Sequence, residues 1–96
     1  IKVQLTPEEV APAVGKEILV YFDVFNDFAE GENVFHAFRV VNNDWSYDVV
    51  PQVDNFHTQS SPYVIKYTEE HHAAVAGAGS IVFTGYGYIL TKITIR

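Results

Sequence analysis

The amino-acid sequence predicts an all-β protein, a small antiparallel β-sandwich or jelly roll with one or two short helical turns. Apolar side chains alternate with other residues over short runs that are rich in β-branched and aromatic types. Glycine, asparagine and proline, which favour turns, separate these runs. The chain has 96 residues, a length typical of one domain. We therefore expect residues 1–96 to form a single β-sandwich module.

The first half of the chain is predicted to contain three strands. Residues 1–5 form the first, and a Thr-Pro-Glu-Glu run at residues 6–9 then begins a short helical turn that ends by Gly15. Residues 17–26 carry apolar side chains on both faces, which is typical of a central strand. Residues 34–41 alternate in the same way and form the third strand.

The second half is predicted to contain four strands. Residues 46–56 are extended, but Pro51 has no backbone N–H, so we expect an edge strand or a break at this point. Further strands are expected at residues 63–67, 80–84 and 88–95.

A short helix is predicted between the strands at residues 63–67 and 80–84. Thr68 can cap its first turn, and the two glutamates that follow lie near the positive end of the helix dipole. Gly77 or Gly79 can end it. We expect a helix over residues 68–75, extending to about Ala76.

The alternation within the strands also predicts the core, because residues two apart share one face of a strand. The residues expected to point inward are Ile18, Val20, Phe22, Val24, Ile81, Phe83, Ile93 and Ile95. The other phenylalanines assigned to the core are Phe25, Phe35 and Phe38. Tyr86 and Tyr88 flank Gly87, and we interpret them as structural tyrosines of a hairpin turn.

Composition excludes several classes of protein. Six basic residues against twelve acidic ones give a net charge of -6, so no basic surface is available for a nucleic acid. Cysteine is absent, which excludes disulfides and thiolate metal sites. No apolar run approaches the roughly 20 residues of a membrane-spanning helix, so we expect no membrane insertion.

Several segments resemble a known type of module. Residues 63–70, 79–85 and 86–95 follow its closing pattern of a strand, a threonine-led helical turn, a glycine-bounded apolar strand and a final Leu-Thr-Lys strand. Residues 14–21 and 43–45 are similar to one of its strand starts and to its mid-domain turn. The pattern resembles galactose-binding-like jelly-roll modules, which are carbohydrate-binding-module-like domains of bacterial multidomain glycan-degrading proteins. The resemblance implies a non-catalytic accessory module on a secreted or cell-surface protein, with a glycan and neighbouring domains as its partners.

Trp45 is the main candidate for ligand binding. It lies in a predicted polar turn, where an indole can present its face to a sugar ring while amides and charged groups bond the hydroxyls. The polar and aromatic residues near it in the sequence are Asn43, Tyr47, Arg39 and Gln52. The alternative is that Trp45 fills one end of the sandwich.

The residue pattern does not predict an enzyme. No serine lies in a nucleophile-elbow context, and nothing in the sequence indicates that Asp23 and Asp48 come close enough to act as an acid–base pair. His71 and His72 are adjacent, so on a helix they point in different directions and cannot both bind one metal. We expect them on a solvated helix face.

We expect no cofactor, although one loop has the composition of a calcium site. Its oxygen-bearing residues are Asn26, Asp27, Glu30, Glu32 and Asn33. Calcium binds six to eight oxygens, roughly, but the spacing does not match the calcium loop of known helix–loop–helix sites. A solvated acidic loop is the simpler interpretation.

The sequence therefore favours a carbohydrate-binding module and leaves a second function open. That alternative is a structural spacer or protein-interaction domain, Ig-like or another β-sandwich, without a ligand. Exposure of Trp45 beside polar side chains would favour binding, and burial of Trp45 would favour the spacer.

Overall fold

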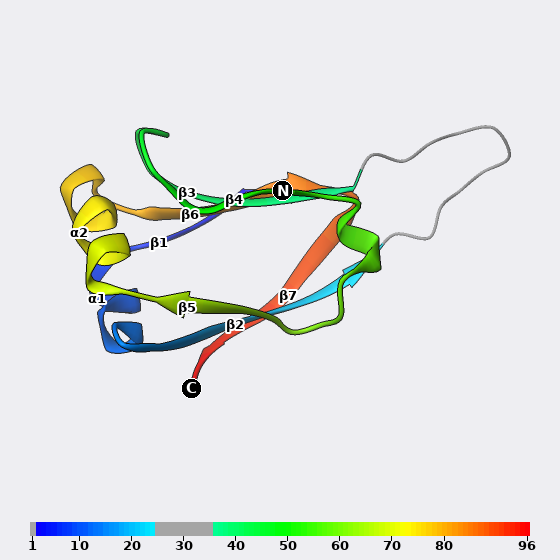
Figure 1. Ribbon diagram of the computed structural model, residues 1–96, viewed down its shortest axis with the longest axis horizontal. Helices are drawn as coiled ribbons and strands as arrows, with labels where there is room; N and C mark the ends of the chain where they lie inside the picture. Colours follow the sequence, from blue (N-terminus) through cyan, green and yellow to red (C-terminus); the bar gives the residue numbers. More distant parts are fainter. Residues whose placement is uncertain (1, 25–35) are drawn as a thin grey trace, which may run out of the picture.

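Two antiparallel sheets pack face to face in a computed structural model that describes residues 2–24 and 36–96 (Figure 1). Within the described residues, the four-stranded sheet has the order β1 (Lys2–Leu5), β6 (Ile81–Tyr86), β3 (Ala37–Asn42) and β4 (Asp48–Asp54). The three-stranded sheet has the order β5 (Tyr63–Tyr67), β2 (Lys16–Val24) and β7 (Tyr88–Ile95). The predicted all-β sandwich is confirmed.

The strand positions follow the local signals in the sequence. β2 is the central strand of its sheet, as its two apolar faces predict. β4 is an edge strand, and its register with β3 shifts at Pro51 and Gln52. The missing N–H of the proline therefore interrupts no hydrogen-bond ladder inside a sheet. β4 ends at Asp54, earlier than expected, because Asn55 has a left-handed φ of 55° and begins the 3-10 helix η2 (Phe56–Thr58).

The two α-helices lie together at one end of the sandwich, at the left in Figure 1. α1 (Pro7–Val10) and α2 (Glu69–Ala78) each begin with a threonine capping box, and the 3-10 helix η1 (Ala11–Ala13) follows α1. Thr68 caps α2 as predicted: its hydroxyl accepts the His71 N–H at 3.1 Å, and Nδ1 of His71 accepts the Thr68 N–H at 3.1 Å. α2 continues past Ala76 and ends at Gly79, whose φ is 97°.

The chain crosses from one sheet to the other at Gly85–Gly87, where β6 ends and β7 begins. In Figure 1 these two strands meet at the right and run back across different layers. Gly85 has a φ of 155°, and a side chain there would overlap the carbonyl group of Ala37. The glycine therefore lets β6 turn while it stays close to β3.

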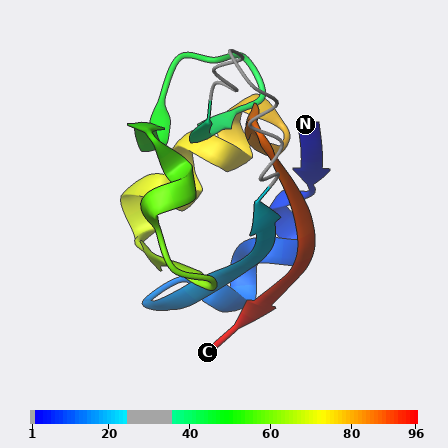
Figure 2. The same cartoon turned by 90° about the vertical axis from the view of Figure 1, so that its right-hand side faces the viewer.

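The core lies between the sheets, whose strands surround it in the end-on view of Figure 2. Four aromatic rings form its centre: the ring of Phe56 lies 4.3 Å from Phe22, 4.7 Å from Phe38 and 5.0 Å from Tyr88 between centroids. Most of the predicted inward residues are buried, and Val24 and Ile93 are half-buried against them. Phe25 and Phe35 lie outside the described residues.

The prediction was wrong for Ile95, which is 39% exposed. Ile95 pairs with Ile18 on one side, but β7 is an edge strand, so no strand covers its other side. The two tyrosines of the corner also differ from each other. Tyr88 is a core residue whose hydroxyl donates to the Thr84 carbonyl at 3.0 Å, whereas Tyr86 is 65% exposed.

Candidate functional site

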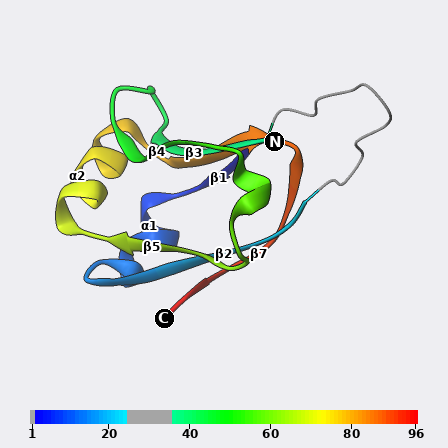
Figure 3. The same cartoon turned by 45° about the vertical axis from the view of Figure 1, so that its right-hand side comes forward.

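A shallow pocket of about 180 Å³ lies on the outer face of the four-stranded sheet. We call it the outer pocket, and its lining residues are Ala37, Phe38, Arg39, Trp45, Gln52, Thr84, Gly85 and Tyr86. Register places the side chains: Arg39 lies opposite Thr84, and Ala37 lies opposite Tyr86. Trp45 comes from the turn between β3 and β4, which rises above the sheet (Figure 3).

The turn that carries Trp45 is held by the buried side chain of Asn42. The Asn42 side-chain oxygen accepts the N–H groups of Ser46 and Tyr47, both at 3.0 Å, and its amide nitrogen donates to the Ala74 carbonyl of α2 at 3.3 Å. Within the turn, hydrogen bonds from the Ser46 hydroxyl and N–H hold the pKa of Asp44 below its usual range. Asp44 is therefore ionised at neutral pH.

Trp45 is an exposed aromatic residue in a rare backbone conformation. Its side chain is 46% exposed, and its φ is 62°. A bulky residue with positive φ is an outlier that costs about 1 kcal/mol or more. Glycine or asparagine would relieve this cost, so the turn alone does not explain a tryptophan.

Arg39 lies between Trp45 and an acidic partner. Its guanidinium carbon is 5.3 Å from the centroid of the Trp45 ring, within the range of a cation–π contact. Its Nε and Nη2 atoms donate to the same Asp48 carboxylate oxygen at 2.8 and 2.7 Å. Arg39 thereby lies over one face of the indole, and Trp45 remains 46% exposed.

Gln52 and Tyr86 complete the outer pocket from its two other sides. Gln52 lies on β4 beside the register shift, and its amide donates to the Asp54 carboxylate at 2.9 Å. Tyr86 lies at the end of β6, at the corner made by Gly85 and Gly87. Tyr86 was predicted to be a structural residue of a turn and not a site residue. The glycines on both sides were its only local signal.

Tyr47 and Asn43, the other two predicted site residues, do not line the outer pocket. Tyr47 packs against the core and α2: its hydroxyl donates to the Glu70 carboxylate at 3.3 Å. Burial, and secondarily the charge of Glu70, raise the pKa of Tyr47. Asn43 accepts a hydrogen bond from the Gln4 amide of β1 at 3.1 Å. The difference arises because Tyr47 follows the turn and faces inward, whereas Trp45 faces outward.

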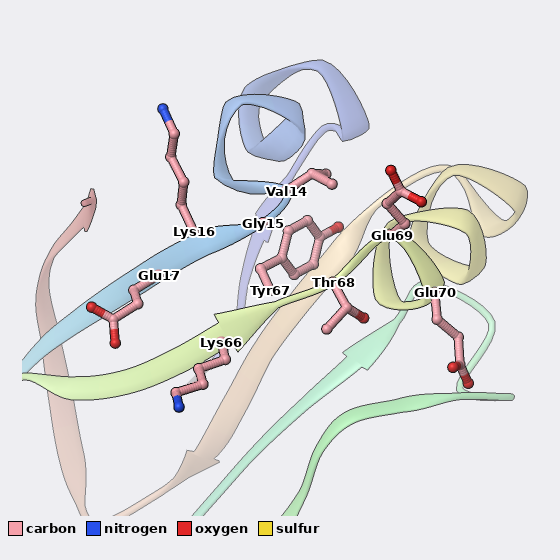
Figure 4. Close-up of a pocket in the computed structure, with 9 residues that line it drawn as sticks. All are labelled: Val14, Gly15, Lys16, Glu17, Lys66, Tyr67, Thr68, Glu69 and Glu70. Carbon is pink, nitrogen blue, oxygen red and sulfur yellow. The ribbon is translucent and has the colours of Figure 1, made fainter.

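A larger hollow of about 770 Å³ lies at the helical end of the sandwich (Figure 4). It is lined by Val14, Gly15, Lys16, Glu17, Lys66, Tyr67, Thr68, Glu69 and Glu70. Figure 4 shows the two lysines and the glutamates pointing away from one another rather than toward a common point. Binding sites for small ligands combine apolar walls with convergent polar groups. The outer pocket, although smaller, is therefore the better candidate.

The structure differs from the solvated face that was predicted for the two histidines of α2. His71 and His72 are half-buried rather than solvated, because His71 forms the α2 capping box and Nδ1 of His72 lies 3.0 Å from the Tyr67 hydroxyl. In the part of the chain that the structure describes, no three acidic or histidine side chains group as metal ligands. The proposed calcium loop lies outside the described residues.

The structure does not support the acid–base pair considered from the sequence. Asp23 is an exposed residue of the three-stranded sheet, whereas Asp48 bonds Arg39 on the outer face of the four-stranded sheet. The two carboxylates are thus on opposite sides of the sandwich and cannot flank one bond. Across residues 2–24 and 36–96, no helix is long and apolar enough to cross a bilayer.

Comparison with known proteins supports the fold. No protein-family model and no curated protein matches the chain. Among solved structures, the chain is similar to part of SGBP-B of the Bacteroides ovatus mixed-linkage glucan utilization locus, solved in complex with a mixed-linkage heptasaccharide. The TM-score is 0.71 at 14% identity, and the match covers 95% of this chain and 22% of that chain. At this identity the likeness shows the fold alone.

Proposed function

We propose that this chain is a non-catalytic carbohydrate-binding module that holds a polysaccharide or oligosaccharide in its outer pocket. The observation that carries the proposal is Trp45, an exposed indole at positive φ with Arg39 against one face. Backbone strain of this kind concentrates at ligand-binding positions, where another part of the structure maintains it. Here the buried Asn42 amide maintains it.

The chemistry of the outer pocket suits a sugar ring. The exposed part of the Trp45 ring can stack on the C–H groups of a sugar and remove them from water. Gln52 and Thr84 offer amide and hydroxyl groups for the ring hydroxyls, and Tyr86 provides a second exposed aromatic surface. Two aromatic side chains on one face fit a ligand longer than a single sugar.

The solved structure with the same fold supports the proposal by analogy, since SGBP-B was solved with a bound heptasaccharide. From this analogy and from the sequence resemblance, we propose a protein that is secreted or at the cell surface, in which neighbouring domains accompany this module. Assignment to the galactose-binding-like jelly-roll modules stays a prediction from the sequence motifs.

A structural spacer is the second candidate, and one observation favours it. The match covers only 22% of the SGBP-B chain, so the corresponding domain is one part of a longer protein. The fold likeness does not place the heptasaccharide on that part.

Affinity electrophoresis and calorimetry against a glycan panel distinguish the two functions. The panel contains mixed-linkage glucan, xyloglucan and galactomannan as neutral polymers, with polygalacturonate and alginate as acidic ones. We expect binding to at least one polymer with a Kd of about 10 µM to 1 mM. This range corresponds to a favourable binding free energy of about 4–7 kcal/mol. Trp45→Ala should weaken it at least about tenfold.

The matched control is Tyr21→Ala, which removes an aromatic ring beside Lys92 on the three-stranded sheet. It should leave binding unchanged. If no polymer binds the wild-type chain, the spacer function replaces our proposal. If Trp45→Ala unfolds the protein, the indole is structural.

A further inference from the structure

We infer that the outer pocket selects uncharged glycans over acidic ones, and that Arg39 acts in it as a positioning residue rather than as a receptor for a carboxylate. This selectivity presupposes the carbohydrate-binding function proposed above. It follows from the partners of the charged groups that surround Trp45.

The charge of Arg39 is already matched inside the protein. Both Nε and Nη2 donate to one oxygen of Asp48, and the guanidinium carbon lies over the Trp45 ring, 5.3 Å from its centroid. Pairing with a carboxylate through two nitrogens is the arrangement that would otherwise recognise an acidic sugar. An acidic ligand therefore meets a guanidinium whose charge is already balanced by Asp48, and only the remaining N–H groups on Nη1 and Nη2 are available to it.

The other charges around the outer pocket are mainly negative among the described residues. Asp54 bonds the Gln52 amide, and Asp44 lies beside Trp45 in the same turn, with its pKa held low by Ser46. Lys2 is the remaining cation on this face, and it lies opposite Thr84 on β1, across β6 from Arg39. A carboxylate stacked near Trp45 thus lies close to three carboxylates, whereas Lys2, next to Thr84 on the β1 side of the outer pocket, is the one cation nearby besides Arg39 among the described residues.

A neutral sugar meets none of these penalties. Its hydroxyls can donate to the Asp48 and Asp54 carboxylates, which are arranged at the edges of the outer pocket. Like charges brought together in a binding site reduce affinity and exclude the wrong ligand. The pairing of Arg39 with Asp48 therefore keeps the indole in place while it cancels the attraction for acidic glycans.

The test compares the neutral and acidic polymers of the same panel, with the wild-type chain and with Asp48→Asn. The wild-type chain should bind its best neutral polymer at least about tenfold more tightly than polygalacturonate or alginate at low salt. Asp48→Asn removes the negative partner of Arg39, so the ratio should fall at least about threefold through tighter binding of the acidic polymers. Higher salt should reduce this gain, because screening weakens it.

The matched control is Asp23→Asn, which changes the net charge equally but lies on the three-stranded sheet. It should leave the ratio unchanged, and thermal unfolding checks that both variants are folded. Equal or tighter binding of an acidic polymer by the wild-type chain would overturn the selectivity while the binding function stands. An unchanged ratio in Asp48→Asn, or the same fall in Asp23→Asn, would also overturn it. If no polymer binds, or Trp45→Ala binds normally, the proposed function fails and the selectivity fails with it.

Discussion

Trp45 has a backbone conformation that glycine adopts at little cost, and its indole is half exposed. We expect Trp45→Gly to change the free energy of unfolding by less than about 1 kcal/mol, because relief of the positive φ offsets the entropy that glycine loses on folding. The same change should weaken glycan binding at least about tenfold, as Trp45→Ala does. Urea unfolding and affinity electrophoresis on one preparation measure both effects.

Asn43→Gly is the matched change in the same turn, and it should leave glycan binding intact because Asn43 bonds Gln4 outside the outer pocket. A loss of more than about 2 kcal/mol in Trp45→Gly would mean that the indole contributes to the fold as a buried side chain does. In that case the position is structural and the spacer function gains support.

Tyr67 determines part of the pH dependence of stability. Burial raises the pKa of Tyr67 to about 12, and burial also raises that of Tyr88. A tyrosine of the unfolded chain loses its proton near pH 10, about two units earlier. The contribution of Tyr67 to the free energy of unfolding is therefore fully present below pH 10 and decreases as the pH rises toward 12. Between these two values only the unfolded chain loses the tyrosine proton.

We expect Tyr67→Phe to reduce this alkaline loss by about 1 kcal/mol at pH 11. At pH 8 the same variant should lose about 1 kcal/mol, the contribution of the contact between the hydroxyl and His72. Urea unfolding at both pH values measures the two effects. An alkaline loss equal to that of the wild-type chain would show that Tyr67 ionises normally in the folded state.

At the scale of elements, the corner between β6 and β7 depends on Gly85. An added Cβ would overlap the Ala37 carbonyl oxygen and come within 2.7 Å of the Tyr88 ring, at a φ of 155° that side chains rarely adopt. Both obstacles are fixed parts of the core or backbone. We expect Gly85→Ala to reduce the free energy of unfolding by more than about 2 kcal/mol.

Gly77→Ala is the matched control for this prediction. Gly77 lies within α2, and nothing within 4 Å would meet its Cβ. Alanine should stabilise the helix there by about 0.5–1 kcal/mol. Denaturant unfolding of the two variants therefore should give changes of opposite sign, and a neutral Gly85→Ala would show that β6 and β3 can separate without cost.

For the whole molecule, the two sheets are held together by one shared core. Phe83 of β6 is fully buried in it, whereas Ile95 of β7 is 39% exposed. We expect Phe83→Ala to cost about 3–5 kcal/mol and Ile95→Ala less than about 1 kcal/mol, because only the first leaves a cavity. Chemical denaturation compares them. A cost below about 1 kcal/mol for Phe83→Ala would mean that the sheets do not depend on this face.

Local patterns in the sequence were sufficient to predict many parts of this fold. Alternation identified the strands, the apolar character of both faces placed β2 at the centre, and Pro51 placed β4 at an edge. Thr68 predicted the start of α2 because a cap acts within one helical turn. In each case the physical cause lies within a few residues of the signal.

The candidate site was predictable only in part. Trp45, Arg39 and Gln52 line the outer pocket as a group, whereas Tyr47 and Asn43 do not. The four residues other than Trp45 were predicted equally, because all of them lie close to Trp45 in the sequence. A turn reverses the chain within a few residues, so neighbours in sequence can face opposite sides of a sheet.

By itself, the sequence determined the fold class, the order of strands along the chain and the helix caps, since these depend on local propensity. Only the tertiary structure decided that β6 lies between β1 and β3, which places Tyr86 in the outer pocket with Trp45. It also decided that Ile95 is left at an uncovered edge. Strand pairing depends on contacts between distant segments, and alternation within a strand specifies its faces but not its neighbours.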